Sequence, residues 1–164
     1  TENLNAFIAG AKYGNAAVKI NSASVSTSAV AQVKSLVASG IDVIYSRRSA
    51  SADAYSTVLG LSKSKKIKFI GVYPDQYFLA STTAKRILLA TLVEDYGLAV
   101  NQLVAAALDN QTITDIVDGI EGKFGRLYTL KNRGLSVRGN QLTSSANARL
   151  TSAKNILLQG KVKL

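Results

Sequence analysis

The stretch Ile67-Lys68-Phe69-Ile70-Gly71-Val72-Tyr73-Pro74-Asp75-Gln76 decides the fold class of this chain. A short apolar run reaches a glycine, stops at the only proline of the sequence and then presents an acid and an amide. Because proline cannot continue a central strand, this pattern predicts a buried parallel strand over 67–72 that ends near Tyr73. Open α/β sheets bind ligands beyond the carboxyl ends of their strands. Asp75 and Gln76 are therefore predicted to lie at a ligand crevice.

Helices and short apolar strands alternate on the amino-terminal side of this stretch. The evidence is the spacing of apolar residues, together with residues that cap helices and glycines that end them. Helices are predicted over 3–14, from Ser26 or Thr27 to Gly40, and over 51–64. Strands are predicted over 17–20 and 41–46. This alternation is typical of a parallel sheet built from right-handed crossover units. We therefore expect an α/β fold, with a Rossmann-like parallel sheet flanked by helices.

The pattern changes beyond Leu79. One long helix is predicted from Thr82 or Thr83 to about Leu108, because apolar residues recur along it at helical spacing. Alternating residues predict two strands over 126–130 and 135–138, joined by a turn over 131–134. A last helix is predicted over 145–158 and ends before Gly160.

Composition narrows the class of protein. A chain of 164 residues with 47% hydrophobic residues suggests one domain with an ample core. The chain has no histidine and no cysteine, which excludes histidine-dependent triads, disulfides and the usual zinc sites. No paired carboxylates or nucleotide-binding loop stand out, and no apolar run is long enough to span a bilayer. We expect a protein that is not an enzyme and that uses no cofactor or metal.

The chain is strongly basic, with a formal net charge of +10. The densest cluster of cations comprises Lys63, Lys65, Lys66 and Lys68, at the end of a predicted helix. Lysines at a helix end complement the helix dipole and solubilise the surface. We favour this interpretation over a phosphate-binding or nucleic-acid-binding patch, because no aromatic residues are interleaved with these lysines. The sequence opens at Thr1 without any methionine. This indicates a processed product or a fragment, in which a cleaved signal peptide would be invisible.

Five residues are candidates for ligand binding. Tyr45 ends a predicted strand, where its ring either stacks on a planar ligand or completes the rim of the core. Arg47 follows it and suits a carboxylate or phosphate, or else a solvated loop. Asp75 and Gln76 suit hydroxyls or a purine edge, or else a turn after proline. Lys85 is predicted in the first turn of a helix, where a cation opposes the dipole; it either has an acidic or ligand partner there or is an ordinary surface lysine.

Six segments in order along the chain resemble one family. They are Phe7-Ile8-Ala9-Gly10-Ala11-Lys12, Gly40-Ile41-Asp42-Val43-Ile44-Tyr45, Gly71-Val72-Tyr73-Pro74-Asp75-Gln76, Thr83-Ala84-Lys85-Arg86, Tyr128-Thr129-Leu130-Lys131-Asn132-Arg133-Gly134-Leu135 and Leu157-Leu158-Gln159-Gly160-Lys161-Val162. Together they resemble the second half of the basic membrane protein family. This family comprises the purine-nucleoside-type substrate-binding lipoproteins of ABC importers.

The resemblance implies a fold of the type I periplasmic-binding-protein kind, in which two Rossmann-like lobes close on a ligand. Residues 1–77 would form the second lobe, and residues 78–164 would supply a crossover helix, a hairpin and a C-terminal helix that return to a first lobe. The first half of the family pattern is absent, so another chain or self-association would complete the fold. The implied role is non-catalytic solute binding for an ABC permease by a membrane-anchored extracytoplasmic lipoprotein.

The resemblance also assigns site roles. Tyr45 matches the aromatic residue that stacks on the base, Lys85 matches a lysine near the ribose, and Asp75 and Gln76 match an acid and an amide of the site. Tyr73 replaces the family's first acid, and Arg47 and Arg48 replace small residues. These departures disfavour a neutral nucleoside and favour a more anionic or a non-nucleoside ligand. The alternative is a divergent structural or surface-interaction protein that has lost ligand binding and self-assembles.

Overall fold

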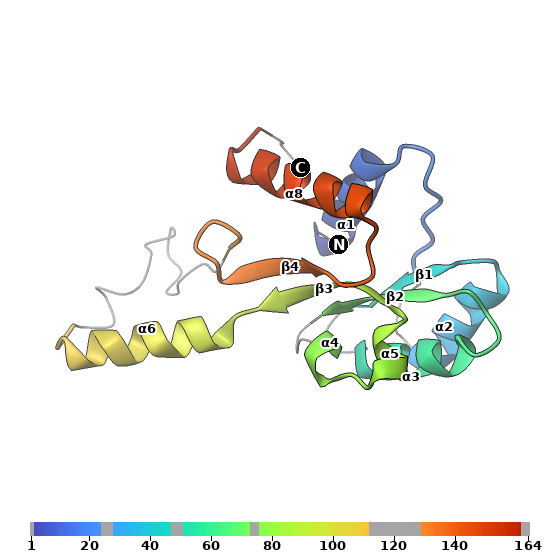
Figure 1. Cartoon of the computed structure of the whole chain (residues 1–164), viewed down its shortest axis with the longest axis horizontal. Coiled ribbons are helices and arrows are strands. Elements are labelled where there is room, and N and C mark those ends of the chain that lie inside the picture. Colours follow the sequence, from blue (N-terminus) through green and yellow to red (C-terminus); the bar gives the residue numbers. More distant parts are fainter. Residues whose placement is uncertain (1, 24–27, 47–50, 73–75, 112–128, 162–164) are drawn as a thin grey trace.

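A computed structural model describes residues 2–23, 28–46, 51–72, 76–111 and 129–161. Its helices are α1 (Glu2–Gly14), α2 (Ala29–Ala38), α3 (Ser51–Leu61), α4 (Gln76–Leu79), α5 (Thr82–Lys85), α6 (Tyr96–Leu108) and α8 (Ser144–Leu158). Its strands are β1 (Val43–Tyr45), β2 (Lys68–Val72), β3 (Leu88–Glu94) and β4 (Leu135–Gly139). Figure 1 shows these elements around one sheet.

The four strands lie in the order β1-β2-β3-β4. β1, β2 and β3 are parallel, with Tyr45 beside Ile70 and Val72 beside Leu92, whereas β4 pairs antiparallel with β3. The predicted α/β fold class is therefore confirmed as a mixed, mostly parallel sheet with flanking helices. Because β1 and β2 are parallel neighbours, their carboxyl ends, at Tyr45 and Val72, lie at the same edge of the sheet.

The core lies between the sheet and the helices α2 and α3. Ile44, Phe69 and Leu88 project from three successive strands into this layer, where Phe69 and Leu88 are fully buried. They meet apolar residues of the two helices, namely Val33, Val37, Ala54 and Val58. Figure 1 shows α1 and α8 on the opposite face of the sheet. Side chains alternate across a strand, so Tyr45 faces this second layer while its neighbour Ile44 faces the core.

Most of the predicted elements are confirmed, with boundaries shifted by a few residues. The helices α1, α2, α3 and α8 and the strands β1, β2 and β4 all correspond to predicted segments. Gly40 ends the second helix with φ of 91°, a left-handed conformation that favours glycine. The cap of α8 is Thr143 rather than a serine, and its hydroxyl oxygen accepts from the backbone N–H of Ala146 at 3.2 Å.

The long helix predicted from Thr82 to Leu108 is wrong in its first half. Residues 88–94 form β3, which the short helix α5 precedes and α6 follows. Both neighbours of β3 in the sheet are distant in sequence, and Leu88 and Thr91 are fully buried between them. Pairing on both sides thus overrides the local helical spacing. Asp95 then starts α6, since its carboxylate accepts from the backbone N–H of Leu98 at 2.9 Å.

The structure differs from two further strand predictions. Residues 17–20 form no strand; the chain turns there, with the side-chain oxygen of Asn15 accepting from the backbone N–H of Ala17 at 3.1 Å. β4 confirms the strand over 135–138, and it pairs antiparallel with β3. Residues 126–128 lie outside the described part of the chain, and residues 129 and 130 belong to no strand. The division at residue 77 stays a prediction, and β3 and β4 continue the sheet that β1 and β2 begin.

Candidate functional site

The carboxyl edge of β1 and β2 is the candidate site that the topology defines. Tyr45 ends β1, and Gln76 begins α4 only four residues after β2 ends at Val72. Arg47, Arg48, Tyr73 and Asp75 lie outside the described residues, as does the side chain of Gln76. The structure therefore places Tyr45 at the edge where α/β sheets bind ligands, and the roles of Arg47, Asp75 and Gln76 stay predictions.

The ring of Tyr45 stacks on the ring of Phe7 from α1. The two ring centroids are 4.6 Å apart and the planes differ by only 7°, so one face of the tyrosine ring is covered by protein. Both side chains are half-buried. A planar solute that stacks on Tyr45 must therefore use its other face or displace Phe7. The structure thus shows Tyr45 as a rim residue that packs on Phe7, and its stacking on a planar ligand stays a prediction.

Sequence reasoning did not find the contact between Phe7 and Tyr45. The spacing of Leu4, Phe7, Ile8 and Ala11 indicated one apolar helix face, but none of the side chains described for α1 is buried. Phe7 and Tyr45 are separated by the whole of α2, so no periodicity relates them. The aromatic residue on the weakly buried helix was the only available signal, because a half-buried ring usually has an apolar partner.

Lys85 lies apart from Tyr45 in the described contacts. It is the last residue of the four-residue helix α5, which Ser81 caps at its start, so the single turn of this helix is both its first and its last. The expected place of Lys85 in a first helical turn is compatible with this, and its role in ligand binding stays a prediction. Its ammonium group lies 5.1 Å from the centroid of the Tyr77 ring, within cation–π range. The next residue, Arg86, accepts from Lys68 Nζ at 2.6 Å through its carbonyl oxygen, at the amino end of β2. Tyr45, in contrast, lies at the carboxyl end of β1.

A buried polar contact joins β3 to the end of β4. The Nδ2 group of Asn140 donates to Thr91 Oγ1 at 2.9 Å, and Thr91 is fully buried. The backbone N–H of Asn140 also donates to the carbonyl oxygen of Leu89 at 2.8 Å. Among the described residues, Asn140 Oδ1 is buried without a hydrogen-bond partner. Sequence analysis missed this pair because the two residues are distant and Asn140 follows a glycine, as turn residues often do.

Tyr55 is a second buried polar group, and it belongs to the core rather than to the ligand edge. Its ring lies 5.6 Å from that of Phe69, and its hydroxyl is buried without a hydrogen-bond partner among the described residues. Desolvation by burial raises the pKa of the Tyr55 hydroxyl above its ordinary value of 10.0. A neutral hydroxyl at this place affects stability and not ligand recognition.

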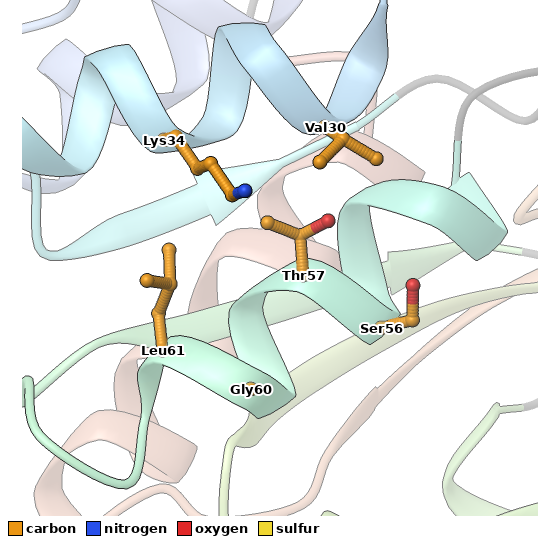
Figure 2. A pocket seen from close by; sticks show the side chains of 6 residues that line it. All are labelled: Val30, Lys34, Ser56, Thr57, Gly60 and Leu61. Atoms are coloured by element: carbon orange, nitrogen blue, oxygen red, sulfur yellow. The ribbon is translucent and has the colours of Figure 1, made fainter.

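A shallow depression of about 380 Å³ lies between α2 and α3. Its lining, shown in Figure 2, consists of Val30, Lys34, Ser56, Thr57, Gly60 and Leu61. The hydroxyls of Ser56 and Thr57 both donate to the carbonyl oxygen of Asp53, at 3.0 and 2.7 Å, so their donors are satisfied within the helix. We place the candidate site at Tyr45, because the polar groups of the depression are one lysine and two hydroxyls that already donate within their own helix.

The residues that the structure describes contain no cluster of three or more acidic side chains placed to hold a metal ion. None of the helices that the structure describes has both the length and the apolar character to cross a membrane.

The fold is similar to that of a solved solute-binding protein of an ABC transporter system. The solved structure that shows this is an ABC transporter system solute-binding protein from Conexibacter woesei DSM 14684, with a TM-score of 0.64 and 15% sequence identity. The alignment covers 95% of this chain and 49% of that chain, so this chain spans about half the length of the protein it matches. No protein-family model matches the sequence, and no curated protein does.

Proposed function

We propose that this chain is the ligand-recognition part of a solute-binding protein and that Tyr45 is its stacking platform. The observation that supports the proposal is the position of the Tyr45 ring at the carboxyl edge of a parallel sheet whose fold resembles a solute-binding protein. The role is non-catalytic and extracytoplasmic, and an ABC permease is the partner that such a protein serves. Membrane anchoring as a lipoprotein and descent from the basic membrane protein family belong to the same proposal.

The proposed ligand is a planar polar solute, with nucleosides and their phosphates as the first class to test. Arg47 would meet an anionic group, and Asp75 and Gln76 would bond hydroxyls or a base edge. The net charge of +10 also favours an anionic solute. On this basis a nucleoside 5′-monophosphate should bind more tightly than the parent nucleoside.

The test is a calorimetric titration of the chain with purine nucleosides, their 5′-monophosphates and neutral sugars. We expect binding of at least one purine compound, a clear loss of affinity in Tyr45→Ala and retained affinity in Tyr45→Phe, because phenylalanine keeps the stacking ring. Tyr13→Ala is the matched control, since Tyr13 is an aromatic residue of α1 that is 61% exposed. Equal affinity of wild type and Tyr45→Ala, or no binding of any compound, would contradict the proposal.

A further inference from the structure

Helix α1 is attached loosely to the rest of the described chain. None of the side chains described for α1 is buried. Every hydrogen bond that the structure gives to residues 2–23 joins two residues of that same segment. An isolated helix of 13 residues is only marginally stable in water. The order of α1 therefore depends on side-chain contacts with the sheet, among which the stack of Phe7 on Tyr45 is the aromatic one.

The same stack fixes the direction of the Tyr45 ring. The backbone of Tyr45 is held by the pairing of β1 with β2, where its partner is Ile70. The Phe7 ring lies against the tyrosine ring, with centroids 4.6 Å apart and planes that differ by 7°. Among the residues that the structure describes, no second ring stacks on Tyr45. The tyrosine ring is thus held from one side and is only half-buried.

A planar solute has two ways to stack on Tyr45: it takes the place of Phe7, or it uses the opposite face of the ring. Taking the place of Phe7 forfeits both the ring stack and the burial of Phe7, which together correspond to roughly 10- to 100-fold in affinity. Stacking on the opposite face forfeits neither of these terms. The magnitudes therefore favour the opposite face, with Phe7 left in place behind Tyr45.

We infer that Phe7 is a positioning residue of the proposed site, and that an occupied site holds α1 more firmly on the sheet. The inference rests on the proposed function, because it concerns a solute that stacks on Tyr45. A ring that Phe7 already holds loses little freedom when the solute arrives, whereas ordering a free side chain lowers affinity by roughly two- to tenfold. Coupling between two binding events is reciprocal, so the bound solute favours docked α1 by the same factor. The order of α1 thus depends on whether the site is occupied.

Calorimetric titration with adenosine 5′-monophosphate tests the positioning role. We expect Phe7→Ala to bind roughly two- to tenfold more weakly than wild type and Phe7→Tyr to bind like wild type, because tyrosine keeps the ring. Phe7→Leu should bind as weakly as Phe7→Ala, whereas a merely structural role would make this apolar variant resemble wild type. Tyr13→Ala is the matched control, since Tyr13 is an aromatic residue of the same helix that is 61% exposed. No residue of α1 belongs to the described core, so we expect each variant to fold, which circular dichroism checks.

Hydrogen exchange of the α1 amides tests the coupling, first without ligand. Tyr45→Ala should speed exchange in α1 by roughly two- to tenfold, whereas Tyr45→Phe should leave it unchanged. Saturation of wild type with adenosine 5′-monophosphate should then slow exchange in α1 by about the factor by which Phe7→Ala weakens binding. The amides of α6, which extends away from the sheet in Figure 1, serve as the internal reference and should not respond.

Three outcomes would overturn the inference alone. Faster exchange in α1 on binding would show that the solute displaces Phe7. Equally tight binding by wild type and Phe7→Ala would show that Phe7 does not position the ring, and exchange in α1 that is the same in Tyr45→Ala as in wild type would show that the stack does not hold the helix. Absence of any binding by wild type would instead overturn the proposed function, and the inference with it, so the two kinds of failure are distinguishable.

Discussion

The stack between Phe7 and Tyr45 yields a prediction about how α1 is held on the sheet. The ring centroids are 4.6 Å apart and the planes nearly parallel, so rings about 3.5 Å apart are displaced sideways by about 3 Å. This is the offset arrangement that aromatic pairs prefer, and it contributes about 0.5–1.5 kcal/mol beyond the burial of area. Phe7→Ala also loses the burial of a half-buried ring, about 1–1.5 kcal/mol.

The stack can be separated from general burial by a double-mutant cycle. Phe7→Ala, Tyr45→Ala and the double variant are unfolded with urea, and the coupling free energy is calculated from the three changes in stability. We expect a coupling of about 1 kcal/mol between the two rings. Phe7→Leu should lose most of this coupling while it keeps an apolar side chain, and Tyr13→Ala should change stability by less than about 0.5 kcal/mol.

Two outcomes would refute this reasoning. Additivity of the single changes to within about 0.3–0.5 kcal/mol would show that the rings do not interact in solution. A coupling that Phe7→Leu preserves would show that apolar contact, and not the parallel arrangement of the rings, holds α1. The first result would also leave both faces of Tyr45 open to a ligand.

The remaining predictions concern the core. Leu88→Ala should destabilise the fold by about 2–5 kcal/mol in urea unfolding, because Leu88 is fully buried, and a change below 1 kcal/mol would contradict β3 as a central strand. Thr91→Val should cost about 1–3 kcal/mol in the same assay by removing the acceptor of the buried Asn140 amide, and a stability equal to wild type would argue against that hydrogen bond. Burial raises the pKa of the Tyr55 hydroxyl, so the stability that this shift contributes is present below about pH 10 and falls at higher pH. Tyr55→Phe should therefore lose less stability than wild type between about pH 9 and pH 11, and parallel pH profiles would contradict the assignment.

The sequence alone was sufficient to predict the helices and strands that are marked by local signals. β2 followed from an apolar run that stops before Pro74, and the end of α2 from Gly40. β3 could not be predicted in this way, because leucine and alanine are good helix formers and only pairing with two distant strands makes residues 88–94 extended. Strand pairing is a property of the whole fold, and one sequence window does not contain it.

The same distinction between local signals and distant contacts applies to the candidate site. The position of Tyr45 at a strand end was predictable, because strand ends can be identified locally and parallel topology places them at one edge. The ring that covers one face of Tyr45 was not predictable, because Phe7 belongs to α1 and the whole of α2 lies between the two residues in the sequence. The helix expected to continue beyond Lys85 ends at that residue, for the same reason that β3 was not predicted.

The pairing of β3 with β4 has a consequence for the order of folding. The two strands are separated by residues 95–134, so their pairing closes a loop of 40 residues, whereas β2 and β3 are separated by only 15, residues 73–87. Long loops are slow to close, and we expect β1, β2 and β3 to assemble before β4 arrives. Until then the longest strand of the sheet presents an open, largely apolar edge. Chains that emerge together at high concentration would pair through that edge, and a chaperone that shields it would raise the yield of folded protein.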